Sequence, residues 1–98
     1  MDHSSHIRLT LAEQTEENLI GAPVYDKTDE KLGTISHMHG SGISPKVVID
    51  VGGFLGIGSK PVQINLDDLD MMRDGSGQIH GLTNWTKDQL RALPEHRD

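Results

Sequence analysis

Two histidines flank one methionine in His37-Met38-His39, and their spacing suits metal binding. In a strand, residues two apart project from the same side, so the two imidazoles could share a transition metal ion. Two ligands are too few for a protein metal site, and a third could come from His80 or from a second copy of the chain. The alternative, which the sequence favours, is two solvent-facing histidines beside a turn, with Met38 directed inward.

The glycine-rich segment Gly53–Lys60 has the glycine spacing of a phosphate-binding loop. Such a loop needs Lys followed by Ser or Thr, whereas the order here is Ser then Lys. It must also open a helix, but the residues that follow have the pattern of a strand. We therefore interpret the segment as a compact turn. The apolar side chains of this segment are Phe54, Leu55 and Ile57. They either pack on the end of the domain or form an exposed patch for a protein partner.

Four aspartates lie close together in the sequence, at Asp67, Asp68, Asp70 and Asp74. A calcium loop of the EF-hand type needs oxygen ligands at alternate positions and a closing Glu, whereas apolar residues are interleaved here. We expect these carboxylates to solvate a turn and cap a short helix. The chain also lacks a Gly-x-Ser-x-Gly elbow, and so small a domain offers little material for a catalytic cleft. We expect a protein that is not an enzyme and uses no cofactor.

The composition limits the size of the protein and its chemistry. A chain of 98 residues has the length of one domain, and with 34% hydrophobic and 3% aromatic residues its core must come from Leu, Ile, Val and Met. A chain this short buries only about 60 to 65% of the surface that it exposes when unfolded, so we predict a homodimer. The absence of cysteine excludes disulfides and Cys-based zinc sites.

The charge and the termini restrict the partners and the location. A formal net charge of -6 repels a phosphate backbone, and no run of Lys or Arg offsets it, so we expect no nucleic-acid partner. The first residues lack both the basic and the apolar region of a signal peptide. No apolar stretch is long enough to cross a bilayer, so the prediction is a cytoplasmic protein that does not insert into membranes.

Two parts of the chain differ in composition and in the spacing of their apolar residues. Residues 1–18 are polar, and we predict that they form a flexible N-terminal arm. The alternate spacing of Ile7, Leu9 and Leu11 would also let this arm add a strand to a sheet edge, in its own chain or in a partner. Residues 19–98 form the predicted domain, in which short apolar runs recur at intervals of about ten residues, as in all-β folds.

Six strands and one helix are predicted within residues 19–98. In the strand Lys46–Val51, alternation places Val48 beside Asp50 on a half-solvated face. The capping-box pattern Thr86-Lys-Asp-Gln89 begins a short C-terminal helix. A glycine-rich turn joins the last two strands into a hairpin. The six predicted strands are Ala22–Asp26, Leu32–His39, Lys46–Val51, Pro61–Leu66, Met71–Arg73 and Gln78–Leu82.

Four segments together resemble the PRC-barrel domain: Leu19–Tyr25, Lys31–Ile35, Gly52–Lys60 and Val62–Leu69. This domain occurs in the H subunit of purple bacterial photosynthetic reaction centres, in the C-terminal part of the ribosome maturation factor, and in stand-alone bacterial proteins. The resemblance implies a mainly β fold, a small closed or partly open antiparallel barrel of about six strands with a short C-terminal helix. It implies docking to other macromolecules and supplies no catalytic residues to carry over.

The expected function is therefore a protein-interaction or assembly module. It would present an edge strand or the region of Phe54, Leu55 and Ile57 to a protein partner. One alternative is a metal- or small-ligand-responsive protein that uses His37 and His39. A ribosome or RNA-processing accessory role, by family analogy, is weakened by the acidic charge and by the missing RNA-binding domain.

Overall fold

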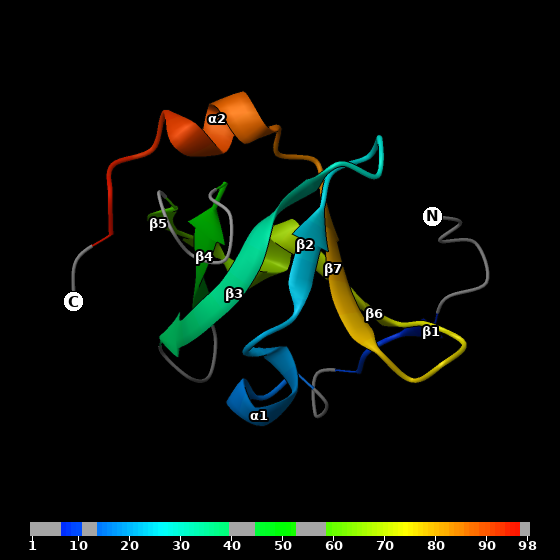
Figure 1. Ribbon diagram of the computed structural model, residues 1–98. Coiled ribbons are helices and arrows are strands. Elements are labelled where there is room, and N and C mark those ends of the chain that lie inside the picture. The colour runs from blue at the N-terminus through cyan, green and yellow to red at the C-terminus, as the bar shows by residue number, and fades with distance from the viewer. Residues whose placement is uncertain (1–6, 11–13, 40–44, 53–58, 97–98) are drawn as a thin grey trace.

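The computed structural model describes residues 7–10, 14–39, 45–52 and 59–96. Their strands form one sheet in the order β1-β6-β7-β2-β3-β4-β5. The elements in chain order are β1 (Ile7–Arg8), α1 (Glu16–Leu19), β2 (Pro23–Tyr25), β3 (Lys31–His39), β4 (Lys46–Val51), β5 (Lys60–Asn65), the 3-10 helix η2 (Leu66–Asp68), β6 (Leu69–Arg73), β7 (Ile79–Thr83) and α2 (Lys87–Arg91). In Figure 1, α1 and α2 lie at opposite ends of the sheet.

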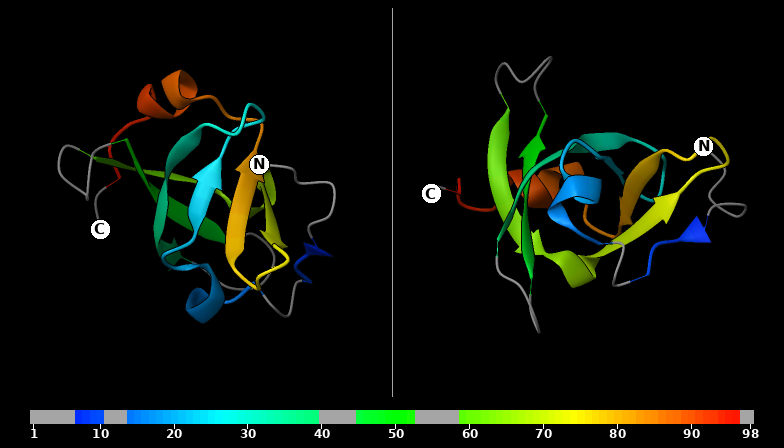
Figure 2. Two further views of the ribbon diagram at one scale, coloured as in Figure 1. Left: turned by 45° about the vertical axis from the view of Figure 1, so that its right-hand side comes forward. Right: turned by 90° about the horizontal axis from the view of Figure 1, so that it is seen from below.

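The sheet curls strongly but does not close. Its edges are β1 and β5, which lie on opposite sides of the molecule in Figure 2. The partly open form of the predicted barrel is therefore confirmed, and the closed form is not observed. The expected antiparallel pairing is wrong at one place: β2 and β7 are parallel, with Val24 beside Gly81. The hairpins β2–β3 and β6–β7 meet through these two strands, which run in the same direction.

The core comes from the inward-facing residues of the curled sheet. Val62 and Ile64 of β5 are buried and Asn65 is exposed, which confirms the predicted alternation. The prediction that Val48 lies on a half-solvated face of β4 is wrong, because Val48 is only 1% exposed. Val48 lies in an inner strand, with His37 of β3 beside it on one side and Gln63 of β5 on the other, and these cross-strand neighbours add to the cover of its side chain.

A β-bulge in β3 redirects the side chains near its end. The pairing with β4 places Ile35 opposite Ile49 and then His37 opposite Val48, so that Ser36 is an extra residue. The Ser36 hydroxyl donates to the Val48 carbonyl at 3.4 Å and also lies 3.2 Å from a carboxylate oxygen of β4. Because of the bulge, Met38 packs against the core while His37 remains exposed.

The N-terminal residues add a strand to the sheet of their own chain. Ile7 pairs with Arg73 and Arg8 with Met72, and the N–H of Leu9 donates to a carbonyl of β6 at 2.8 Å. Leu9 is buried, so the apolar alternation places at least this side chain in the core. This is the strand addition that the sequence allowed as an alternative, while the mobility of the arm stays a prediction.

The C-terminal helix packs at one end of the sheet, above β4 and β5 in Figure 1. The predicted capping box is confirmed: the Thr86 hydroxyl accepts from the Gln89 N–H at 3.1 Å, and the Gln89 side chain accepts from the Thr86 N–H at 3.0 Å. Leu90 is buried in the core. The Lys60 ammonium donates to the Arg91 carbonyl at 2.7 Å, which satisfies a group at the helix end. No helix among the described residues has the length and apolar character that crossing a membrane requires.

Candidate functional site

Strand β5 carries the longer free edge of the sheet, since β1 has only two residues. In an antiparallel pair, alternate residues point both backbone groups toward the partner strand and the others point both away. The Pro61 carbonyl accepts a hydrogen bond from outside the sheet, from the His96 N–H. Pro61 therefore faces away from β4, and Gln63 and Asn65, two and four residues later, face the same way.

The outward residues of this edge differ in what they can bind. Pro61 has no N–H, and at an edge this costs the β4–β5 ladder no hydrogen bond. Gln63 offers both a donor and an acceptor, and within the described ranges its outward N–H and C=O make no hydrogen bond. Unpaired backbone groups of this kind are the template onto which a further extended chain can pair. We call the outward side of Pro61, Gln63 and Asn65 the β5 edge.

A hollow of about 180 Å³ adjoins the β5 edge. A cavity of about 150 Å³ can hold a benzene molecule, so this hollow has room for about one large apolar side chain. Trp85 and Leu93, which line the hollow, are half-buried and pack against the core. The residues that line it are Lys46, Gln63, Ile64, Asn65, Asp68, Trp85 and Leu93.

The charged groups at this hollow do not form a catalytic pair. Lys46 and Asp68 are the ionisable side chains that line it, and both are exposed. Catalytic acids and bases depend on burial or on close charged neighbours to shift their pKa values. What the arrangement offers is an apolar wall of Trp85 and Leu93, backbone hydrogen-bonding groups, and one charge of each sign at the rim.

The C-terminal segment already crosses part of the β5 edge. After Leu93, which packs on the core, the chain reaches Pro61, where the His96 N–H donates to the Pro61 carbonyl at 2.7 Å. The His96 ring lies 5.1 Å from the ring of His39, centroid to centroid. In Figure 1 this segment descends from α2 on the same side as β5. The sequence offered no signal for this contact, because His96 lies beyond the predicted helix.

The structure brings together two of the three predicted metal ligands. The rings of His37 and His39 are stacked with their centroids 6.1 Å apart. His80 is elsewhere: it is 3% exposed and contacts Tyr25 edge-on at 6.1 Å, and β2 separates its strand from β3. In the part of the chain that the structure describes, no group of three or more His, Cys, Asp or Glu side chains is placed to hold a metal ion. Metal binding by these histidines stays a prediction.

The predicted interaction residues Phe54, Leu55 and Ile57 lie outside the described residues. Residues on either side of their segment lie near the end of α2. Lys60 donates to the Arg91 carbonyl, and a Cβ built on Gly52 would lie 3.1 Å from the Arg91 guanidinium. The expectation that these three side chains contact a partner stays a prediction.

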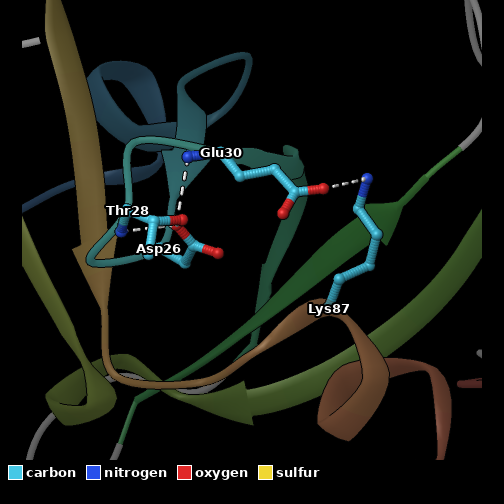
Figure 3. A network of polar contacts seen from close by, with 4 residues as sticks. All are labelled: Asp26, Thr28, Glu30 and Lys87. Carbon is cyan, nitrogen blue, oxygen red and sulfur yellow. Dashed lines mark hydrogen bonds and ion pairs between the residues drawn. The ribbon is translucent and has the colours of Figure 1, made fainter.

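The buried carboxylate Asp26 lies in the loop between β2 and β3, and its hydrogen bonds hold this loop together. One of its oxygens accepts from the Thr28 hydroxyl at 2.6 Å, the Thr28 N–H at 2.8 Å and the Glu30 N–H at 3.0 Å (Figure 3). The Thr28 hydroxyl, followed by the two backbone donors, lowers the pKa of Asp26 despite its desolvation. Glu30 also contacts Lys87 at 3.4 Å, which joins this loop to the start of α2.

A second hollow of about 430 Å³ lies between α1 and the turn that joins β6 to β7. Ile20, which is 44% exposed, and Ile79 contribute apolar surface to it. Glu17 is the ionisable residue in its lining. This hollow therefore has no converging acid and base either.

A curled, mainly antiparallel sheet with edges at β1 and β5 and a short C-terminal helix is the architecture of a small β module. The family model of the PRC-barrel domain matches residues 16–80, which is more than half of the chain. The chain belongs to the PRC-barrel domain family, as the resemblance implied. The match ends at His80, so α2 lies outside it. No curated protein matches this chain.

Proposed function

We propose that this protein is a non-enzymatic binding module that takes up an extended segment of a partner protein along the β5 edge. The observation that carries the proposal is the outward N–H and C=O of Gln63, at a sheet edge and next to a hollow lined by Trp85 and Leu93. Pairing of the partner's main chain would supply affinity, and an apolar side chain in the hollow would supply selectivity.

The occupant that fits this edge best is a segment of another protein. Symmetric pairing of two β5 strands about Gln63 would place Pro61 of one copy opposite Asn65 of the other. Pro61 has no N–H to offer there, so a symmetric pair would leave the outward carbonyl of Asn65 without its ladder donor in both copies, whereas a partner segment meets Pro61 only once. Two copies would also each carry a net charge of -6. The homodimer predicted from the short chain, if it forms, would use another surface.

The test uses peptides selected from a displayed library of random 12-residue sequences. Peptides that bind the full chain are titrated into labelled protein, and amide shifts in an NMR spectrum locate the site. We expect the shifts to concentrate on β5 and on the residues around Trp85. Peptides that shift only other surfaces, or a library that yields no binder of any form of the chain, would contradict the proposal.

A pair of variants at Gln63 isolates the backbone contact. Gln63→Pro removes the outward N–H and leaves the bonds to β4 intact, as Pro61 does two residues earlier. Gln63→Thr changes the side chain and keeps the N–H. Because one hydrogen bond is lost and the added ring obstructs the approach, we expect about tenfold weaker binding for Gln63→Pro and less than about a twofold change for Gln63→Thr. Equal binding by both variants, with thermal unfolding showing both folded, would refute pairing at this edge.

A further inference from the structure

The β5 edge has an occupant within the chain itself. Residues 94–96 belong to neither a helix nor a strand, yet the His96 N–H donates to the outward carbonyl of Pro61 at 2.7 Å. On the sheet face, the His96 ring rests 5.1 Å from the ring of His39. The segment thus follows Leu93, which lies just after the end of α2 and beside the hollow, and passes over the edge of β5.

A strand added to β5 would require the same carbonyl. The outward residues of the edge are Pro61, Gln63 and Asn65, and a partner strand that pairs with all three must place its own N–H on the Pro61 carbonyl. The backbone of His96 occupies that position. The partner strand and residues 94–96 therefore cannot both pair at the start of β5.

We infer that residues 94–96 act as an intramolecular competitor, which covers the start of the β5 edge until a partner segment displaces it. This inference rests on the proposed function, because it concerns the regulation of the same edge. A cap of this kind lowers the apparent affinity by the fraction of molecules in which the edge is open. It also protects an exposed strand edge from unwanted pairing when no partner is bound.

The contacts of this segment suit a cap that can be displaced. Pro94 and Glu95 are exposed and His96 is only half-buried. A single backbone hydrogen bond contributes about 0.5 to 1.5 kcal/mol, so its loss corresponds to about a 2- to 10-fold change in an equilibrium constant. A partner that pairs along Pro61, Gln63 and Asn65 and fills the hollow would compete with the His96 N–H for the Pro61 carbonyl.

The experiment compares four forms of the chain for binding of the library-selected peptides: the full chain, a chain that ends at Leu93, His96→Pro and His96→Ala. The truncated chain retains Leu90 and Leu93, which pack with the core. His96→Pro removes the N–H that donates to Pro61, and His96→Ala keeps this N–H while removing the ring. We expect the truncated chain and His96→Pro to bind about 2- to 10-fold more tightly than the full chain, and His96→Ala to show a smaller gain.

Amide exchange of His96 provides a readout that is independent of any ligand. In the full chain we expect this N–H to exchange more slowly than in an unstructured peptide of the same sequence, and to lose this protection when a peptide binds. A peptide that binds at β5 with equal affinity for the full and truncated chains would overturn the inference and leave the proposed function standing. Binding that is absent from all forms, or insensitive to Gln63→Pro, would refute the proposed function and the inference together.

Discussion

Asp26 and Asp74 make the same three hydrogen bonds in two different hairpin loops. In each loop, Oδ1 accepts from the N–H and the hydroxyl of the residue two positions later and from the N–H of the residue four positions later. The distances are 2.8, 2.6 and 3.0 Å for Asp26 and 2.9, 2.7 and 3.0 Å for Asp74. The two hairpins, β2–β3 and β6–β7, therefore share one loop design, Asp-x-Thr-x-Glu in the first and Asp-x-Ser-x-Gln in the second.

The hydrogen bonds of Asp26 make stability depend on pH. Its pKa lies below the ordinary value of 3.8, chiefly because the Thr28 hydroxyl donates to the ionised carboxylate. Its contribution to the free energy of unfolding is thus fully present above about pH 4 and is lost as the pH falls through the lower folded-state pKa. We expect Asp26→Asn to be less stable than the natural chain at pH 7, with a difference that shrinks below about pH 4. Urea unfolding from pH 2 to 7 measures this, and a constant difference would contradict it.

The loop design requires a positive φ at one position, which Asp29 occupies in the first loop (φ 65°) and Gly77 in the second (φ 86°). A Cβ on Gly77 would meet nothing within 4 Å, so Gly77→Ala tests backbone strain alone. We expect Gly77→Ala to cost about 1 kcal/mol and Asp29→Gly to cost less than about 0.5 kcal/mol or to stabilise. Gly75→Ala is the matched control, since Gly75 also has open space around it and no positive φ. The same loss of stability at Gly75 and Gly77, measured by thermal unfolding, would argue against strain as the cause.

Gly33 allows β3 to pass close to the backbone of β4. A Cβ at this position would lie 2.1 Å from the Asp50 carbonyl oxygen, which cannot move without disturbing the sheet. We expect Gly33→Ala to lower the free energy of unfolding by about 3 kcal/mol or more. At Gly81 the nearest atom to a Cβ is the flexible Met71 sulfur at 3.0 Å, so Gly81→Ala should cost only about 1 kcal/mol. The midpoints of urea unfolding compare the stability of the two variants. A Gly33→Ala chain as stable as Gly81→Ala would show that β3 and β4 can move apart at Gly33 with little loss of free energy.

The start of α2 depends on its cap more than on its ion pair. Thr86→Ala removes the hydroxyl that accepts from the Gln89 N–H, and we expect a loss of about 1 kcal/mol. Lys87→Ala removes the contact with Glu30, whose side chain is 57% exposed, and should cost less than about 0.5 kcal/mol. Thermal unfolding of both variants gives the comparison. If Lys87→Ala lowered the stability more than Thr86→Ala, the ion pair between Lys87 and Glu30 would be the stronger contribution, and it would hold the loop between β2 and β3 against α2.

Local features of the sequence predicted β2 to β7 and the C-terminal helix, because these elements depend on neighbouring residues, but they did not predict α1, whose first residues fall in the predicted arm. The alternation of Val62 and Ile64 with polar residues predicted β5, and the pattern from Thr86 to Gln89 predicted the cap of α2. The recurring Asp-x-Thr/Ser loop could also have been found in the sequence, since both copies keep the same spacing. The bulge at Ser36 could not, because it becomes visible only when β3 is aligned with β4.

The sequence by itself therefore determined a single mainly β chain with hairpins, a capped C-terminal helix and a PRC-barrel likeness. Only the tertiary structure decided that β5 is a sheet edge, that Val48 is buried, that His80 lies apart from His37, and that His96 reaches Pro61. The physical reason is that periodicity, turns and caps arise from contacts a few residues apart. The order of the strands in the sheet, and the covering of the β5 edge by residues 94–96, arise from contacts between residues far apart in the chain. No local pattern encodes such contacts.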